Sequence, residues 1–267
     1  MKYQIIPPSE PLKPFVSYYW ILETEKLVHE TERIIPAGYM QLIFYRSDRA
    51  FSHTGKEWQP RTFIGGQTNT YSELTLSGTI QMIAVTFRPY GAKAFFNFPM
   101  LDSLNRTIPV DCLGDKELEE LEDKIMNTQE THTCILLIEE FLLKRMSTDQ
   151  DPYFKRLQSS LLLANMQPET GTSELASASC FSPKQYKRIF NDYIGINPKE
   201  FLRILRFQRA LHILHNHPAI LFADLAFQAG YYDQAHLTKE FKLFSGYTPT
   251  QYKAVCIPYS DYFTETD

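Results

Sequence analysis

The segment from Gly171 to Tyr252 contains nearly the same sequence twice. The first copy reads Ser173-Glu174-Leu175-Ala176, Phe181-Ser182, Tyr186-Lys187-Arg188-Ile189-Phe190 and Gly195-Ile196-Asn197-Pro198. The second copy reads Ala223-Asp224-Leu225-Ala226, Gly230-Tyr231, Leu237-Thr238-Lys239-Glu240-Phe241 and Gly246-Tyr247-Thr248-Pro249. The copies are offset by 50 residues up to the turn and by 51 from Asp233 onwards, so one residue is inserted there. Because a solenoid needs at least three repeats, the pattern indicates a duplicated unit within one domain.

Each copy predicts a short helix, a tight turn and a second helix. Gly230 suits the left-handed conformation that ends a helix, whereas Cys180 at the matching place is a poorer choice. A capping residue, Ser182 in the first copy and Asp233 in the second, precedes the second helix. This order is the layout of a helix-turn-helix motif, whose second helix enters the major groove of DNA.

The second helix of each copy combines an apolar stripe with a polar outer face. Tyr186, Ile189 and Phe190 recur at three- and four-residue steps, as do Leu237 and Phe241. The residues off the stripe are Lys184, Gln185, Lys187 and Arg188 in the first copy, and Gln234, Ala235, Thr238 and Lys239 in the second. We expect these two outer faces to be the surfaces that meet DNA.

A further helix, from about 198 to 215, is predicted between the copies. This helix has apolar positions along its length and a basic edge formed by Arg203, Arg206 and Arg209. About 17 residues at ~1.5 Å each span roughly 26 Å. With side offsets at both ends, such a spacer holds two reading helices about one DNA turn, ~34 Å, apart.

Length and pattern predict two domains in the 267 residues. Residues 1–146 contain short candidate strands at 15–23, 34–35, 40–45, 58–64, 71–77 and 80–87, followed by helices at 114–126 and 132–146. Residues 147–151 are expected to be a linker, 152–257 a DNA-binding domain and 258–267 a tail. The predicted fold class is α+β: an antiparallel β-barrel or jelly-roll-like domain with accessory helices, then an all-α domain of two helix-turn-helix motifs joined by a long helix.

Charge is distributed unevenly between the two parts. The whole chain has a net charge of −4. Residues 1–151 carry 15 Lys and Arg against 21 Asp and Glu, whereas residues 152–267 carry 12 against 10. This asymmetry is typical of one DNA-facing part and one acidic part with another role.

The segment from Tyr153 to Tyr252 resembles the C-terminal DNA-binding domain of AraC/XylS-type transcriptional regulators. The resemblance rests on Gly230-Tyr231, Leu237, Phe241-Lys242, Gly246-Tyr247-Thr248-Pro249 and Tyr252, with Tyr231 where the family has Phe. It implies base-edge contacts by Lys184, Lys187 and Arg188 in the first motif and by Gln234, Thr238 and Lys239 in the second; Gln185 and Ala235 complete the predicted reading faces.

Arg and Lys donate to guanine O6 and N7, Gln pairs with adenine, and the Thr methyl packs on a thymine methyl. Ser182, Arg203, Arg206, Arg209 and Lys242 are predicted to contact phosphates, with solvated helix-face charges as the alternative for the arginines.

Residues 1–145 resemble the sensor-like N-terminal domain of some of these regulators. The resemblance rests on Pro11-Leu12 to Val16 with Tyr19-Trp20, on Ile35-Pro36-Ala37-Gly38, and on Phe87-Arg88-Pro89-Tyr90-Gly91-Ala92. Its predicted ligand-binding residues are Trp20, Phe44, Phe63, Phe87 and Arg88, with Phe95 and Phe96 as further aromatic candidates. Arg88 is the candidate partner for a ligand carboxylate, and the alternative role of the aromatic residues is plain core. The helix at 132–146 is either a dimer surface or a packing element.

Catalytic, metal and cofactor sites are not expected. The histidines His29, His53 and His132 form no ligand pattern, and the sequence has no nucleophile elbow or phosphate-cradling glycine loop. The four cysteines form no C-x-x-C pair. With neither a signal peptide nor a run of ~18 apolar residues, we expect a cytoplasmic protein without membrane contact.

The leading interpretation is a sequence-specific DNA-binding transcriptional regulator that is not an enzyme. Its expected partners are double-stranded DNA, a small-molecule effector, a second copy of the chain in a homodimer, and RNA polymerase if it activates transcription. One alternative is a ligand-binding or interaction protein with degenerate DNA binding. Another is a metal-dependent barrel enzyme fused to a regulator.

Overall fold

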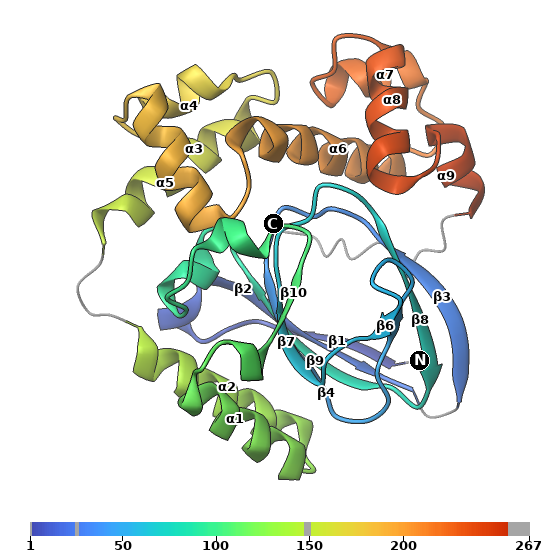
Figure 1. Cartoon of the computed structure of the whole chain (residues 1–267). Coiled ribbons are helices and arrows are strands. Elements are labelled where there is room, and N and C mark those ends of the chain that lie inside the picture. The colour runs from blue at the N-terminus through green and yellow to red at the C-terminus, as the bar shows by residue number, and fades with distance from the viewer. Residues whose placement is uncertain (1, 25–26, 147–150, 256–267) are drawn as a thin grey trace.

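The computed structural model describes residues 2–24, 27–146 and 151–255. A β-rich N-terminal part precedes a helical C-terminal part (Figure 1), so the expected α+β class is confirmed. Most of the predicted linker, residues 147–150, and the whole predicted tail at 258–267 lie outside the described residues.

The strands form two antiparallel sheets. The larger sheet has the order β1 (Lys2–Ile6), β2 (Val16–Glu23), β9 (Gln81–Phe87), β4 (Gln41–Tyr45), β7 (Thr62–Gly65) and β10 (Thr107–Pro109). The smaller sheet has the order β3 (Val28–Ile34), β8 (Ser72–Gly78), β5 (Phe51–Ser52) and β6 (Glu57–Trp58). The predicted barrel-like domain is therefore a pair of sheets and not one closed barrel.

The larger sheet separates two apolar clusters because side chains alternate along a strand. Tyr19 and Ile21 belong to the cluster that also contains buried residues of α1 (Lys116–Asn127) and α2 (Thr131–Arg145). Trp20 and Leu22 belong to a smaller cluster with residues of the second sheet. Four short 3-10 turns lie in the described connections of this part: η1 (Glu10–Leu12), η2 (Gly91–Ala94), η3 (Met100–Ser103) and η4 (Val110–Cys112).

The C-terminal part contains seven described helices. They are α3 (Pro152–Met166), α4 (Thr172–Ala178), α5 (Pro183–Ile194), α6 (Pro198–Asn216), α7 (Phe222–Gln228), α8 (Gln234–Ser245) and α9 (Pro249–Val255). Helices α4 and α5 form the first predicted motif, and α7 and α8 form the second. Figure 1 shows the two motifs at opposite ends of α6. The long helix between the copies is thus present as expected.

The turns and caps repeat with the sequence. The side chains of Ser182 and Asp233 each accept a hydrogen bond from a backbone amide in the first turn of the following helix. Cys180 and Gly230 both have positive φ, 53° and 83°. The left-handed turn is therefore kept in both copies, although only Gly230 adopts it without a Cβ penalty.

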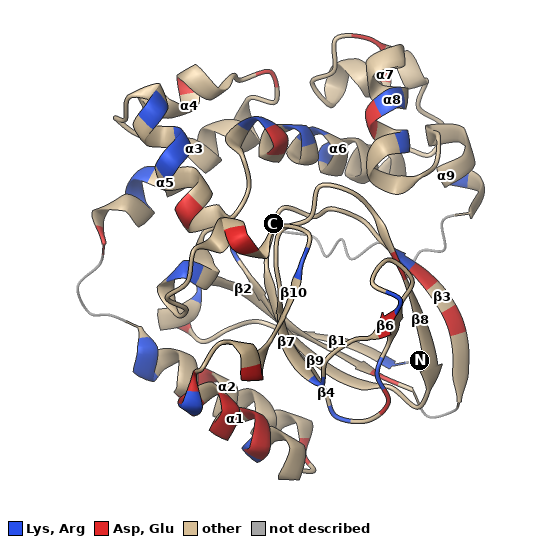
Figure 2. Ribbon diagram, viewed as in Figure 1, with Lys and Arg blue, Asp and Glu red and all other residues tan. Residues whose placement is uncertain are grey.

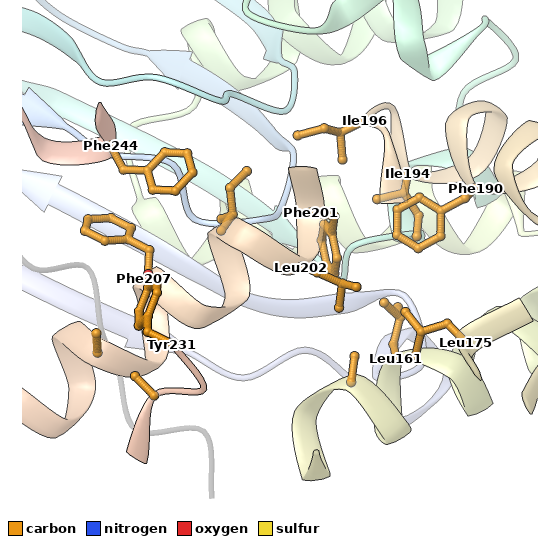
Figure 3. Packing of buried hydrophobic residues seen from close by; sticks show 14 of the residues in the cluster. Leu161, Leu175, Phe190, Ile194, Ile196, Phe201, Leu202, Phe207, Tyr231 and Phe244 are labelled. Atoms are coloured by element: carbon orange, nitrogen blue, oxygen red, sulfur yellow. The ribbon is translucent and has the colours of Figure 1, made fainter. Parts of the chain in front are cut away.

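Helix α6 joins the motifs through one apolar core. Near its beginning, Phe201 packs against Phe190 of α5 with ring centroids 5.3 Å apart. Near its middle, Phe207 packs against Phe241 of α8 at 5.1 Å and against Phe244 at 5.3 Å. Figure 3 shows these two groups of rings along the same helix. Matching aromatic contacts therefore fix each second helix to the spacer.

The N-terminal part contacts the second motif through Arg33. Its Nη1 donates to the carbonyl of Ser245 at 2.9 Å, and its guanidinium lies 4.1 Å from the ring centroid of Tyr247 and 4.6 Å from that of Tyr71. Its Nη2 also pairs with Glu73 at 2.5 Å. We call Arg33, Tyr71 and Tyr247 the Arg33 clamp. It holds the carboxyl end of α8 against the smaller sheet.

Other contacts tie the N-terminal part to α5 and α6. Lys93 pairs with Asp192 of α5 at 3.1 Å. Asn69 donates to Glu200 of α6 at 3.3 Å, and Gln208 of α6 donates to the carbonyl of Pro36. Both motifs and their spacer therefore rest on the same domain.

The structure also differs from the expected elements. Strand β1 is not among the predicted strands. The sequence predicts a strand only at 34–35, whereas β3 begins six residues earlier, at Val28, and ends at Ile34. Strand β3 contains His29, Glu30, Glu32 and Arg33, and this polar composition gives no apolar strand pattern from which it could be predicted. An edge strand tolerates such residues because it pairs on one side only, here with β8. The predicted strand at 58–64 is divided between β6 and β7.

Candidate nucleic-acid interface and inter-sheet cavity

The predicted reading faces of α5 and α8 lie on the surface. Lys184, Lys187 and Arg188 are exposed on α5, and Gln185 is half-buried. On α8, Gln234, Ala235 and Lys239 are exposed. Thr238 is half-buried, and its hydroxyl donates to the carbonyl of Gln234 at 2.8 Å, which leaves its methyl as the group for an apolar contact. Neither face is covered by the N-terminal part.

The two faces differ in charge. The face of α5 carries three cations, whereas that of α8 carries Lys239, with Lys242 exposed one turn further on. Figure 2 shows Lys and Arg on α5 and along α6, while Asp and Glu gather on α1. The second motif instead exposes Phe227, and it exposes Tyr232, at 93%, directly before the cap of α8. The first motif is therefore the more favourable electrostatic partner for phosphates.

Ser182 and Lys242 remain exposed, as a phosphate contact requires, but the structure gives Arg203 a different role. Its Nε donates to Oε1 of Glu240 at 2.5 Å, and the Glu240 side chain is only 4% exposed. His236 lies 3.4 Å from the same oxygen. Arg203 thus joins α6 to α8 as half of a largely buried ion pair. The Arg203 side chain is still 30% exposed, so its predicted phosphate contact stays a prediction.

Arg206 and Arg209 are also engaged inside the domain. The guanidinium of Arg206 lies 5.9 Å from the ring centroid of Tyr231. Arg209 donates to the carbonyl of Asn165 at the end of α3, and burial lowers its pKa. Burial is also the main cause that raises the pKa of the Tyr231 hydroxyl, followed by the charge of Glu240. The predicted basic edge of α6 therefore contacts neighbouring parts of the domain, and its phosphate contacts stay a prediction.

A cavity of about 470 Å³ lies between the two sheets. Its walls are mostly apolar and aromatic, and they include Trp20, Leu22, Ile43, Tyr45, Phe63, Leu74, Leu76 and Met82. Polar lining groups include Glu32, Gln41, Gln59 and Arg106. Gln208 of α6 and Tyr71 of the Arg33 clamp also line it. Its size and lining are typical of a small-molecule site, and Gln208 brings α6 into its wall.

Only two of the five predicted ligand residues, Trp20 and Phe63, line this cavity. Phe44 and Phe87 are fully buried in the cluster on the opposite face of the larger sheet, and Phe95 and Phe96 belong to the same cluster. Arg88 is exposed, and its Nε donates to the carbonyl of Lys13 at 2.7 Å. Parity along β4 explains why Phe44 does not line the cavity, because Ile43 and Tyr45 face it and Phe44 faces away.

The cavity residues that the sequence prediction missed include Glu32, Tyr45, Gln59 and Arg106. Tyr45 follows from Ile43 by the two-residue period of β4, so its position was available as a signal. Glu32 required the recognition of β3. Arg106 and Gln208 come from a loop and from the other domain, and no local pattern brings them together.

The fold and the exposed faces define a tandem helix-turn-helix domain on a double-sheet domain. Residues 175–254 match a family model described as a helix-turn-helix domain, and residues 4–109 match one described as a domain of unknown function (DUF6597). A curated relative from Haemophilus influenzae, an uncharacterized HTH-type transcriptional regulator, is 33% identical over 101 residues. That match covers 37% of this chain and 34% of the relative, so it spans about a third of that protein's length. The C-terminal part therefore contains a helix-turn-helix domain.

The solved structures that match this chain have low identity and TM-scores below 0.5. ToxT from Vibrio cholerae O395 is 11% identical, with a TM-score of 0.46 over 94% of this chain and 97% of that one. The DNA-binding domain of AdpA in complex with a target DNA is 22% identical, with a TM-score of 0.36 over 37% of this chain and 90% of that one. An AraC-type regulator from Chromobacterium violaceum is 22% identical, with a TM-score of 0.35, over 38% and 90%. None of the helices in the described residues has the length and hydropathy needed to cross a bilayer.

Proposed function

We propose that this chain is a sequence-specific DNA-binding transcriptional regulator that reads two successive major grooves. The observation that carries the proposal is the repeated placement of an exposed polar helix face, on α5 and on α8, at the two ends of α6. Lys184, Lys187 and Arg188 contact bases or phosphates in one groove, and Gln234, Thr238 and Lys239 contact the next. A DNA turn of ~34 Å separates the two contacts.

The N-terminal part supplies control in this proposal. The inter-sheet cavity binds a small-molecule effector, and its wall reaches α6 through Gln208. The outer face of α2, with Leu136 and Leu143 exposed, is the candidate surface for homodimer formation. If the protein activates transcription, it also contacts RNA polymerase. A regulator of this kind acts in the cytoplasm and needs no catalytic activity of its own.

Selection of bound duplexes from a random library by the full chain tests the DNA-binding proposal. We expect enriched duplexes with two half-sites whose centres lie about 10–10.5 base pairs apart. Inserting five base pairs between them turns one half-site to the opposite face, so a chain that engages both loses affinity. Enrichment of one isolated half-site, with no loss on insertion, would contradict the two-groove arrangement.

Salt dependence separates this proposal from an interaction protein whose motifs no longer bind DNA. Counterion release makes log K fall linearly with log salt, with a slope of about −0.9 for each phosphate neutralised. We expect a clear negative slope for the selected duplex. Absence of any salt-dependent duplex binding would favour the interaction protein.

A further inference from the structure

The reading face of α8 differs from that of α5 at matched positions of the repeat. From Asp233 onwards the copies are offset by 51 residues, so Ala235 stands opposite Lys184 and Thr238 stands opposite Lys187. Both lysines and Ala235 are exposed, and Thr238 is half-buried. The second copy therefore presents two small side chains where the first copy presents two ammonium groups.

Both small side chains carry a methyl group on one face of α8. Ala235 and Thr238 are three residues apart on the helix, so their Cβ atoms are neighbours, about 5–6 Å apart. The Thr238 hydroxyl donates to the carbonyl of Gln234 at 2.8 Å, so its one proton is already used within the helix. Successive bases of one DNA strand are ~3.4 Å apart along the axis. The spacing of the two side chains thus matches bases one or two steps apart.

The one-residue insertion in the second copy adds an aromatic ring at the amino end of α8. The copies match at Phe181 and Tyr231 and again at Ser182 and Asp233. Tyr232 lies between the two matches and has no counterpart in the first copy. It is 93% exposed, whereas the buried Tyr231 and the cap formed by Asp233 fix the backbone on both sides. The insertion therefore presents a ring to solvent from an anchored turn.

Thymine is the base that such a surface distinguishes. Its C5-methyl group lies in the major groove, and apolar side chains recognise it by contact. The first residues of a reading helix are the ones that meet base edges, and in α8 they include Ala235 and Thr238. Gln234 on the same helix has the amide group that pairs with adenine, the partner of thymine.

We propose that the second motif recognises a half-site rich in A·T pairs through thymine methyl groups. Ala235 and Thr238 contact two of these groups, and the Tyr232 ring contacts a third at the amino end of α8. A phosphate contact by Tyr232 is less favourable because the carboxylate of Asp233 adjoins it in the chain and repels an anion. The inference deepens the proposed function and rests on it.

The proposal gives the binding site a direction. The three cations of α5 favour guanine, which offers the O6 and N7 acceptors. The two half-sites then differ in base composition, so one chain binds the pair in one orientation only.

Deoxyuridine lacks only the C5-methyl group of thymine, so its substitution tests the contact directly. The probe is the duplex selected by the full chain, with each thymine of each half-site replaced singly. Arg188→Ala identifies the α5 half-site, because it relaxes the base preference there. In the other half-site we expect two or three positions at which deoxyuridine weakens binding about fourfold, the factor for one buried methyl group. Fluorescence anisotropy measures each affinity.

Single variants assign those positions to side chains. Thr238→Ser removes the methyl group and keeps the hydroxyl, so it should bind the thymine duplex about fourfold more weakly and become indifferent to one deoxyuridine position. Thr238→Val keeps a methyl group and should stay sensitive there. Tyr232→Ala should become indifferent to a different position. Phe227→Ala, which removes another exposed ring, is the matched control and should leave every deoxyuridine effect as in the parent.

A double variant copies the first motif onto the second. Ala235→Lys/Thr238→Lys replaces both methyl-bearing side chains by cations, so the deoxyuridine effects at their positions should vanish. The dependence of log K on log salt should become steeper, by about 0.9 for each added phosphate contact. Circular dichroism and the melting temperature of each variant confirm that it is folded.

Two results overturn the proposal. They are equal affinity for thymine and deoxyuridine throughout the α8 half-site, and deoxyuridine effects that persist in both Thr238→Ser and Tyr232→Ala. The first result is expected if these side chains are only solvated. Selection of no duplex at all would remove the regulator together with this inference. A selected duplex with two half-sites and no deoxyuridine effect would remove thymine recognition alone.

Discussion

The two helix-turn-helix motifs share a backbone plan but differ in what occupies it. Ile189 of α5 and Glu240 of α8 are at equivalent positions of the repeat, and both are 3% exposed. The first motif fills this place with a hydrocarbon side chain, and the second fills it with a carboxylate that is paired with Arg203. The outer faces differ in parallel, since α5 carries three cations and α8 carries mainly neutral groups. The two motifs therefore keep the same backbone geometry, but they differ in the contacts that stabilise them and in the groups they offer to DNA.

The largest expected effect is at the buried pair. Arg203→Ala leaves Glu240 with a buried charge beside His236 and the Tyr231 hydroxyl but without its arginine, so we expect a loss of about 3 kcal/mol in the free energy of unfolding. The double variant Arg203→Met/Glu240→Ile copies the apolar solution of the first motif and should stay close to the parent protein. Urea unfolding measures both. An unchanged midpoint for Arg203→Ala would show that solvent already screens the pair.

The next effect concerns DNA affinity. Arg188→Ala should cost ~1–3 kcal/mol on the selected duplex and relax base preference in one half-site. Lys239 occupies the equivalent position in the second motif. Lys239→Ala should cost less DNA-binding free energy because fewer cations act together on that face. Titrations at several salt concentrations compare the two. Equal losses, or an unchanged preference in Arg188→Ala, would place the electrostatic difference elsewhere.

A smaller effect is expected at the matching turns. Gly230→Ala forces a side chain into the left-handed region and brings its Cβ to 2.6 Å from Pro168, so a loss of about 2 kcal/mol is expected. Cys180→Gly relieves the same conformation in the first motif and should raise stability by about 0.5 kcal/mol, after the entropy of the unfolded glycine is subtracted. Thermal unfolding of both variants should therefore shift in opposite directions.

The smallest effect compares the caps. Ser182→Ala and Asp233→Ala each remove one side-chain hydrogen bond to a first-turn amide, and each should cost about 1 kcal/mol. Chemical unfolding measures the pair. A loss in one variant alone would mean that solvent replaces the cap in the other motif.

The sequence predicts most of the helical part because its signals are local. Ser182, Asp233 and Gly230 specify caps and turns within a few residues, and α6 follows from its apolar period. The ion pair of Arg203 with Glu240 joins residues 37 positions apart, and no periodicity links them. For the same reason the aromatic residues alone did not locate the cavity: Phe44 and Phe63 look equivalent until strand parity and sheet pairing separate them.

Strand β3 places two adjacent side chains on opposite surfaces. Glu32 lines the cavity, and Arg33 holds the last turn of α8 through Ser245 and Tyr247. Binding free energies are reciprocal. If a cavity ligand favoured one position of β3 and thereby changed the affinity of α8 for DNA, bound DNA would change the affinity for that ligand by the same factor. The free ligand concentration would then set how much operator is occupied, and a high local density of operators would draw ligand into the protein. A single strand would then be enough to couple a ligand in the proposed cavity site to the proposed DNA contact of α8.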